Sequence, residues 1–466
     1  MINKGAWVID RRHRHAPKGW SLAVQRKAGL PNAMKASVVG GSMAGLFAAL
    51  LLKRAGWQVR VYERIGADLS GRGAGIVTHR QLFDVLERAG ITRGAAKMGV
   101  AVRGRQVLAR DGALVGKLPL EQVLTSWGHL HALLRNALGD NSYHHGRTLE
   151  RVVESDKVVA AHFADGAVAE ADLLVGADGI FSTVRAQLLP DVRPNYAGYI
   201  AWRGLVDEAD LSAATRDALC EHFSFSLPEG EQMLGYPVAG ADEAPAVGAR
   251  RFNFVWYRPA TEGTLRDLLT DIDGVSHSLS IPPNRIRAEA IDGLRRDAHR
   301  LLAPQFAEVV QKTRQPFIQA ILDLETPSMA VGRRTVLIGD AAFVARPHVG
   351  AGVTKAAADA CALVEALETE ADLECALKSF EARRLAVGRS IVDRARHLGA
   401  YMQAQIHTPE EKQAAERHRS PQAVMTETAS MAFLEGTGSA INTNYPSSQK
   451  RRPRCRRCSI RSTCGD

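Results

Sequence analysis

A glycine-rich turn near the start of the chain is the feature that most constrains its fold. Residues 36–39 form an apolar segment, the turn follows at 40–45, and residues 46–54 have the spacing of an amphipathic helix. A second apolar segment, 59–62, ends at Glu63. Two short apolar segments that flank one helix predict a βαβ unit, with both strands parallel in one sheet. The sequence therefore predicts an α/β fold with a Rossmann-like domain.

The turn has the composition of a diphosphate-binding loop. Gly40 and Gly45 occupy the first and last positions of a Gly-x-Gly-x-x-Gly pattern, and Ser42 replaces the middle glycine. Such a turn directs backbone N–H groups and the positive end of a helix dipole at a diphosphate. Glu63, followed by Arg64, stands where an acidic residue accepts a hydrogen bond from a ribose hydroxyl. These residues predict a dinucleotide site, in which the Ser42 hydroxyl can donate to phosphate.

Two later segments also run from an apolar strand into a Gly/Asp turn. Residues 172–176 are followed by Asp178, and residues 335–338 are followed by Gly339 and Asp340. A carboxylate at such a strand end can accept hydrogen bonds from hydroxyl groups. The second segment then opens a further helix, whose free N–H groups and dipole face whatever precedes it. The residues of that opening are Pro347, His348, Gly350, Ala351 and Gly352.

Together the three turns resemble the fingerprints of the class A FAD-dependent aromatic monooxygenases, which share the fold of p-hydroxybenzoate hydroxylase. Their order and spacing match that family over residues 34 to 405 approximately. The resemblance is strongest to the 2,6-dihydroxypyridine 3-monooxygenase branch, in which the serine variant of the first turn also occurs. The stretches that support the branch are Gly40-Gly41-Ser42, Tyr196-Ala197-Gly198-Tyr199, Trp202-Arg203-Gly204, Tyr236-Pro237, Phe252-Asn253-Phe254, Trp256-Tyr257 and Arg346-Pro347-His348.

The resemblance implies a cofactor, a reaction and a set of cofactor-binding residues. FAD is bound non-covalently and reduced by NADH or NADPH, and dioxygen then forms a C4a-hydroperoxyflavin. This species hydroxylates a small hydroxylated aromatic or N-heteroaromatic ring. Two positions depart from the family, because Phe343 replaces a histidine and Trp127 lies where an arginine often contacts the cofactor. The expected FAD-binding residues are Gly40, Ser42, Gly45, Glu63, Arg64, Asp178, Gly339, Asp340, Pro347, Gly350, Ala351 and Gly352.

Hydroxylation of such a ring is easier when a ring hydroxyl loses its proton, so a base or polar relay should face the substrate. His348 lies between Pro347 and the helix that caps the flavin, and we expect it to be catalytic. Tyr236 and Arg203 are the other two catalytic candidates, and His79 ranks with them. The expected apolar walls of the substrate pocket are Phe225, Tyr236, Phe254 and Trp256.

The resemblance also divides the chain. The fold class expected is a Rossmann-like FAD-binding domain with an inserted, largely antiparallel β-sheet substrate domain and a C-terminal helical region. The expected boundaries are a basic extension at 1–33, the FAD-binding domain at 34–189 and 328–407, the substrate domain at 190–327, and a loosely ordered basic tail at 408–466.

Charge and cysteine positions argue against other classes of partner. The net charge is +10, but residues 1–33 and 450–466 each carry +6, which leaves −2 for residues 34–449. We therefore expect a cytoplasmic enzyme with no nucleic-acid or membrane partner. A homodimer is a possible oligomeric state. Cys455 and Cys458 have the spacing of half a zinc site, but only Cys464 accompanies them, and zinc takes four ligands. No metal is expected.

Two other readings remain open at this point. An FAD-dependent reductase or dehydrogenase of related fold would form its product without dioxygen. A non-catalytic protein is the other possibility, either a flavin-binding scaffold with the same three turns or a protein that acts through its basic tails. Fold-level similarity does not separate these classes.

Overall fold

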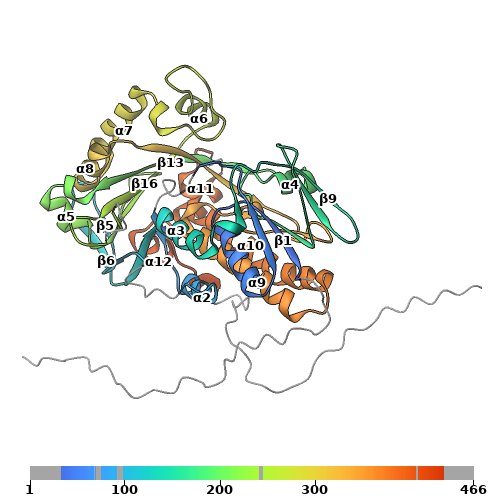
Figure 1. The fold of residues 1–466 in the computed structure, drawn as a ribbon. Helices are drawn as coiled ribbons and strands as arrows, with labels where there is room; N and C mark the ends of the chain where they lie inside the picture. The colour runs from blue at the N-terminus through green and yellow to red at the C-terminus, as the bar shows by residue number, and fades with distance from the viewer. Residues whose placement is uncertain are drawn as a thin grey trace, which may run out of the picture.

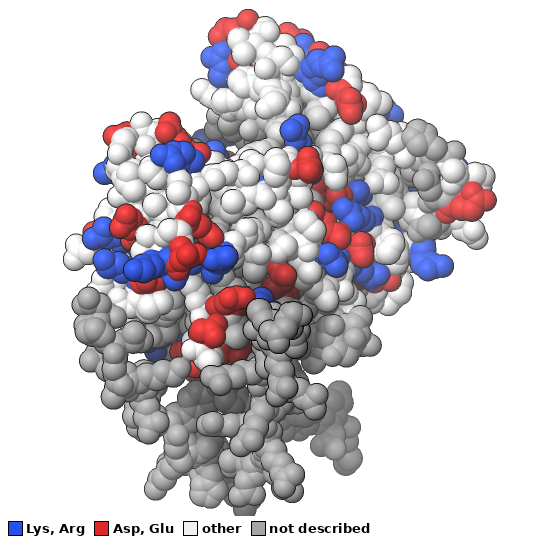
Figure 2. Space-filling model, turned by 90° about the vertical axis from the view of Figure 1, so that its right-hand side faces the viewer, with Lys and Arg blue, Asp and Glu red and all other residues white. Residues whose placement is uncertain are grey.

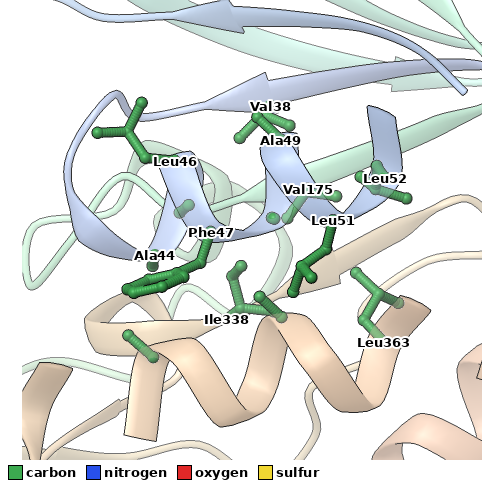
Figure 3. Packing of buried hydrophobic residues seen from close by; sticks show 14 of the residues in the cluster. Val38, Ala44, Leu46, Phe47, Ala49, Leu51, Leu52, Val175, Ile338 and Leu363 are labelled. Carbon is green, nitrogen blue, oxygen red and sulfur yellow. The ribbon is translucent and has the colours of Figure 1, made fainter. Parts of the chain in front are cut away.

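The computed structural model describes residues 33–67, 69, 75–91, 98–240, 245–405 and 408–434. The expected βαβ unit is present, with β1 at Lys35–Val39, α1 at Met43–Arg54 and β2 at Gln58–Tyr62. Helix α1 is buried from Met43 to Leu52, because it is covered by strands on one side and by α9 (Gly352–Thr369) on the other. Figure 3 shows Phe47 and Leu51 of α1 pointing toward Ile338 and α9.

The dinucleotide-binding sheet has five parallel strands in the order β18-β12-β1-β2-β8. Strand β18 is Thr335–Leu337, β12 is Leu173–Gly176 and β8 is Tyr143–His144. The three strands that precede the predicted turns are therefore neighbours. Because parallel strands end at the same edge of a sheet, all three turns lie along one edge.

Smaller elements surround this sheet. A meander of β9 (Leu149–Glu154), β10 (Val159–Phe163) and β11 (Val168–Ala171) follows β8. A second small sheet contains β3 (Gly75–Val77), β7 (Gln122–Ser126) and β4 (Val100–Val102). Three helices complete this part, α2 (Arg80–Arg88), α3 (Trp127–Leu138) and α4 (Thr183–Leu188).

The inserted sheet has eight strands in the order β19-β17-β13-β16-β15-β14-β5-β6 and is largely antiparallel, as predicted. Its main strands are β13 (Asn195–Asp207), β14 (Phe223–Ser226), β15 (Gln232–Val238), β16 (Arg251–Pro259) and β17 (Phe317–Glu325). The short β19 is Phe343–Val344. Strands β5 (Arg105–Leu108) and β6 (Leu114–Leu118) extend the sheet, and β5 pairs in parallel with β14. The sheet therefore includes residues from outside the expected substrate domain.

The two faces of this sheet carry different aromatic residues, because side chains alternate along a strand. On one face Phe252, Phe254 and Trp256 pack in a core with Phe306. The helices on that side are α5 (Ala213–Leu219), α6 (Glu262–Leu268), α7 (Ala288–Leu301) and α8 (Pro304–Lys312), as Figure 1 shows. Phe254 and Trp256 were expected to line the substrate pocket, and that expectation is wrong for both residues.

The C-terminal region begins with two long helices, α9 and α10 (Leu373–Gly399), which pack against each other and, through α9, on α1. The tail expected to be loosely ordered from residue 408 instead forms α11 (Pro409–Glu416) and α12 (Pro421–Glu427). It is ordered because its apolar residues, Val424 and Met425 among them, are buried against the inserted sheet. Residues 1–32 and 435–466, with the cysteine pair at 455 and 458, lie outside the described residues.

The surface drawn in Figure 2 interleaves acidic and basic side chains among large uncharged areas. Within the described part of the chain, that face has no continuous basic surface. In the same residues, no helix combines the length and the apolar character that crossing a bilayer requires.

Candidate active site

A groove runs along the sheet edge where the first two turns meet. Its lining includes Gly40, Ser42, Glu63, Arg64 and Asp178, all of which the sequence predicted as cofactor-binding residues. The lining also includes residues that the sequence did not single out for this role: Tyr62, Leu69, Trp127, Arg147, Leu149, Phe181 and Thr183.

The glycines of the first turn are required by close backbone approach. Gly40 has φ +105°, and a Cβ atom there would lie 2.3 Å from the carbonyl oxygen of Ala177. A Cβ atom at Gly45 would lie 1.8 Å from the Gly40 carbonyl oxygen. Ser42 is the N-cap of α1, but its hydroxyl makes no capping hydrogen bond. The turn is therefore tight, and the Ser42 hydroxyl is not engaged by the helix that it begins.

Glu63 supports the same turn and lines the groove. One oxygen of its carboxylate accepts from the N–H of Gly41 at 2.8 Å, and the other accepts from the N–H of Ile65 at 2.9 Å. The side chain is 7% exposed. Its carboxylate thus fixes the glycine turn from the end of β2, which adds a structural role to the ligand role expected from the sequence.

Asp178 has one satisfied carboxylate oxygen and one unsatisfied one. Oδ2 accepts from the N–H groups of Thr183 at 2.7 Å and Val184 at 3.2 Å, so it caps α4. Oδ1 is buried, and it has no hydrogen-bond partner among the described residues. Burial raises the pKa of this carboxyl above its usual value. Arg185 in the same motif donates to the Ala341 carbonyl at 2.9 Å and so joins the second turn to the third.

The third turn is held from behind by a buried ionic cluster. The N–H of Gly339 donates to Asp359 at 3.0 Å, and Asp359 accepts from Arg384 at 2.8 Å. The Lys355 ammonium lies 3.5 Å from the same carboxylate. Asp340, the next residue, is exposed at the sheet edge. The cluster therefore orients the turn and leaves the Asp340 carboxylate free to meet a ligand.

The segment before α9 forms an open cradle. Pro347 begins a short 3-10 helix that ends at Val349, and Gly350 follows in the left-handed region with φ +62°. Ala351 is the N-cap of α9, and a Cβ atom at Gly352 would meet nothing within 4 Å. The first N–H groups of α9 have no acceptor within the helix, and the helix dipole lies behind them.

These features fit FAD. Tight glycine turns admit a diphosphate, the unsatisfied Asp178 oxygen and the exposed Asp340 carboxylate can accept from hydroxyl groups, and the α9 cradle suits the electron-rich edge of a flavin. Ser42, the N-cap of α1, lines the groove together with Asp178.

His348 is paired with a tyrosine that the sequence did not single out as a site residue. His348 is 2% exposed, and its Nε2 lies 2.7 Å from the Tyr199 hydroxyl. The ring of Tyr257 meets the imidazole edge-on, with centroids 4.4 Å apart. Burial lowers the pKa of His348 to about 3, so the imidazole is neutral at physiological pH. Its Nδ1 is buried and unpartnered among the described residues.

The face of the sheet opposite the aromatic core carries the other predicted residues. Arg203 follows Tyr199 and Ala201 along β13 on this face, and it donates to Gln319 at 2.8 Å. Tyr236 lies opposite Asn253 in the β15–β16 pair and is 4% exposed. Burial raises the pKa of Tyr236 to about 12, and the Arg203 charge partly opposes that shift.

Two further side chains at this face, Asn253 and Tyr257, were not singled out from the sequence as site residues. Asn253 accepts from the N–H of Gly75 at 3.2 Å, and its Nδ2 has no partner among the described residues. The period-two alternation along residues 195–207 and 251–259 could have placed these residues and Tyr199 on one face. The Nδ1 of His79 lies 3.0 Å from the Thr354 hydroxyl.

Comparisons with known proteins agree with this geometry. A family model described as FAD binding domain-like matches residues 196–323. The chain is 33% identical over 374 residues to 2,6-dihydroxypyridine 3-monooxygenase of Paenarthrobacter nicotinovorans. This alignment covers 80% of this chain and 92% of that protein. It is 28% identical over 415 residues to 3-amino-4-hydroxybenzoate 2-monooxygenase of Streptomyces cremeus, covering 86% and 95%.

Solved structures give the same result. The 2,6-dihydroxypyridine-3-hydroxylase from Arthrobacter nicotinovorans superposes with a TM-score of 0.75 and 31% identity, over 82% of this chain and 95% of that chain. Klebsiella pneumoniae HpxO, complexed with FAD and uric acid, matches with a TM-score of 0.67 and 25% identity, over 86% of this chain and 95% of that one.

Fold and site thus define a flavoprotein oxidoreductase that binds FAD and adds oxygen to aromatic or heteroaromatic rings. The chain belongs to the class A FAD-dependent aromatic monooxygenases and is homologous to 2,6-dihydroxypyridine 3-monooxygenase. The resemblance found in the sequence is confirmed, and the reading as an enzyme replaces the non-catalytic alternative.

Proposed function

We propose that this chain hydroxylates a small planar ring of the hydroxypyridine class, using NADH or NADPH and dioxygen. The observation that carries this proposal is the buried Tyr199–His348 pair at the face of the inserted sheet. Tyr236, Tyr257 and Asn253 share that face and combine apolar ring surface with a few polar groups. Pockets of this composition hold small planar ligands in one orientation. The similarity to a dihydroxypyridine hydroxylase supports the same substrate class.

The cofactor-binding residues expected from the sequence keep their proposed roles. Gly40, Ser42 and Gly45 receive the diphosphate, while Glu63 and Arg64 meet the adenosine end. Bound FAD supplies the reduction and oxygen-transfer chemistry, and the protein orients it. The groups that would face the ribityl chain and the flavin are Asp178, Gly339, Asp340, Pro347, Gly350, Ala351 and Gly352.

His348 is proposed to orient the substrate by accepting a hydrogen bond from its hydroxyl group. Its imidazole is neutral, because burial lowers its pKa to about 3. With Nε2–H donating to the Tyr199 oxygen, the unpartnered Nδ1 is left as a hydrogen-bond acceptor. Arg346 lies over the Tyr199 ring and is itself held by Asp323 at 2.8 Å. The tyrosine is therefore fixed in position, and its hydroxyl holds the imidazole in one orientation.

Arg203 is the proposed source of positive charge at the same face. Its guanidinium is half-buried, lies over Phe317 at 5.8 Å and donates to Gln319. A cation near the ring favours the deprotonated, electron-rich form of a hydroxypyridine. Tyr236 would contribute ring surface and a hydroxyl that stays protonated, since its pKa is raised to about 12.

The proposal is tested by a screen of ring compounds on the FAD-loaded protein. Hydroxypyridines, hydroxynicotinates and hydroxybenzoates are each added with NADH or NADPH, and coenzyme oxidation, oxygen uptake and product are measured. We expect 2,6-dihydroxypyridine or a close analogue to stimulate coenzyme oxidation and to give a hydroxylated product. Stimulation by benzoates alone would contradict the assigned substrate class.

The domain boundaries, the cytoplasmic location and a homodimeric state are further proposals. The boundaries follow the resemblance over residues 34–405, with the substrate domain at 190–327. Static light scattering of the purified chain distinguishes a monomer from a dimer.

A further inference from the structure

A segment near the end of the described chain lies against the flavin cradle. This C-terminal strap, residues 424–434, contains the end of α12 and a 3-10 helix at Ala432–Leu434. Met425 and Ala429 belong to the buried cluster that includes Tyr199, Tyr236 and Tyr257. The apolar residues at the other end of the strap, Met431 and Leu434, pack with Val349 and Ala351 of the cradle and with α10. The strap therefore touches both the proposed substrate face and the cradle.

Ala429 makes the direct contact with the cradle. Its N–H donates to the carbonyl oxygen of His348 at 2.7 Å. A Cβ atom at Gly350 would lie 2.8 Å from the Cβ of Ala429, so the two backbones are in close contact. Ala429 has φ +51°, and among the described residues it is the sole non-glycine residue with positive φ. Such a conformation costs free energy and persists only where its surroundings impose it.

Arg105 supplies that constraint. The side chain is 1% exposed and donates to the carbonyl oxygens of Met425 at 2.7 Å, Thr428 and Ala429 at 3.2 Å. These are carbonyls at the C-terminal end of α12, which attract a cation. Gln122 accepts a further hydrogen bond at 3.0 Å, and Phe223 lies under the guanidinium at 5.2 Å. Among the described residues, no carboxylate is paired with Arg105, and three of its four hydrogen bonds go to the strap.

We propose that the C-terminal strap is part of the flavin site and that Arg105 is its positioning residue. Arg105 sets the strap, and the Ala429 N–H then holds the turn that leads from His348 to Gly350. FAD binding at the cradle and docking of the strap therefore stabilise each other, as linked equilibria must. This inference rests on the proposed placement of FAD at Gly350–Gly352 and does not depend on the identity of the ring substrate.

The experiment compares Arg105→Met with Arg105→Lys and with a matched control, Arg250→Met. Arg250 is also a buried arginine, 4% exposed, but it binds Glu208 at 2.7 Å where β13 ends and β16 begins. FAD dissociation constants are measured by flavin fluorescence. Hydrogen exchange of peptides covering residues 424–434 is followed with and without FAD. Neither measurement depends on turnover. Both results can therefore be interpreted even if the chain does not hydroxylate a hydroxypyridine.

For the parent and for Arg250→Met, we expect FAD to slow exchange in the strap, with dissociation constants within about twofold of each other. Arg105→Met should bind FAD on the order of tenfold more weakly, a typical size for coupling between sites. Its strap should exchange rapidly with or without FAD. Arg105→Lys keeps the charge, so its FAD affinity and its rate of strap exchange should lie between those of the parent and of Arg105→Met. This variant preserves the test if the methionine variant does not fold. Unchanged FAD affinity in both Arg105 variants, or equal weakening in Arg250→Met, would overturn the proposal.

Discussion

The hydroxyl of Tyr199 lies 2.7 Å from Nε2 of His348, although 149 residues separate the two in the chain. Strand β13 supplies the tyrosine, and the turn before α9 supplies the histidine. The inserted sheet and the FAD-binding part thus meet at this hydrogen bond. It connects the cradle proposed for the flavin to the face proposed for the substrate.

Replacing Tyr199 by phenylalanine should therefore impair ring hydroxylation more than flavin reduction. The change leaves Nε2 of a buried imidazole unpaired and removes the group that orients it. We expect hydroxylation to slow on the order of tenfold, which corresponds to the loss of about one hydrogen bond. Rapid-mixing absorbance separates the two half-reactions. Equal slowing of both would argue that Tyr199 acts only on the fold.

The pH dependence of stability is predicted from His348, which is buried, and His79, which is half-buried. Burial lowers the pKa of His348 to about 3 and that of His79 to about 4, while both titrate near 6.5 when unfolded. Between these values the unfolded chain binds more protons, so the free energy of unfolding should fall as the pH drops below about 6.5. At about pH 5, each histidine should account for a loss of about 2 kcal/mol.

Urea denaturation of the parent and of His348→Gln at about pH 8 and about pH 5 measures this effect. Glutamine does not titrate, so the variant should lose less stability between the two pH values than the parent does. An identical loss in both chains would show that His348 is not the group responsible.

Glu63→Ala should weaken FAD binding by about 1–3 kcal/mol, the worth of one or two hydrogen bonds to a charged group. Part of this loss is indirect, because Glu63 also accepts from the N–H of Gly41 in the diphosphate turn. Isothermal titration of the apoprotein with FAD gives the value. Glu63→Gln keeps one acceptor oxygen, so it should lose less FAD-binding free energy than the alanine variant. A larger loss in Glu63→Gln than in Glu63→Ala would contradict the role of Glu63 as a hydrogen-bond acceptor.

The two faces of the inserted sheet predict different effects for neighbouring residues of β16. Trp256→Leu should destabilise the fold by about 2–4 kcal/mol through lost packing, without changing the KM for the ring substrate. Tyr257→Phe removes a hydroxyl from the face that holds His348 and should raise that KM while largely preserving the melting temperature. A KM change in the Trp256 variant alone would reverse the assignment of the faces.

Removal of residues 1–33 and of everything beyond about 445 should leave FAD binding and turnover intact, because the excess charge of the chain resides in those flanks. The described strap ends before that cut and stays in place. Melting temperature and FAD content of the trimmed and full-length chains make the comparison. Loss of both on trimming would show that one flank belongs to the fold.

The sequence predicts the parts of this fold that local patterns determine. The β1–α1–β2 unit, the order of the three turns and the strands near 199, 223, 233 and 251 lie where hydrophobic periodicity and glycines place them. The Glu63 and Asp178 carboxylates lie at the groove for the same reason. Their positions depend on strand ends, which apolar segments mark well.

Contacts between distant segments could not be predicted in this way. The Tyr199–His348 pair depends on how two domains dock, and the Arg105 contacts join residues 320 or more apart. Strands β5 and β6 join the inserted sheet from outside its sequence segment, which no local pattern indicates. The helices within residues 409–434 were likewise not predicted, because the segment itself is polar. They depend on the burial of Val424 and Met425 against the rest of the protein.

The central claim is that the chain transfers oxygen from dioxygen to a hydroxylated pyridine, and isotope labelling tests it most directly. The FAD-loaded protein is given NADH or NADPH, 2,6-dihydroxypyridine and isotopically labelled dioxygen, and the product is analysed by mass spectrometry. We expect a product that carries one labelled oxygen atom and whose formation stops when oxygen is excluded. A product without the label, or turnover that continues without oxygen, would contradict the account and place the chain among the flavin-dependent reductases.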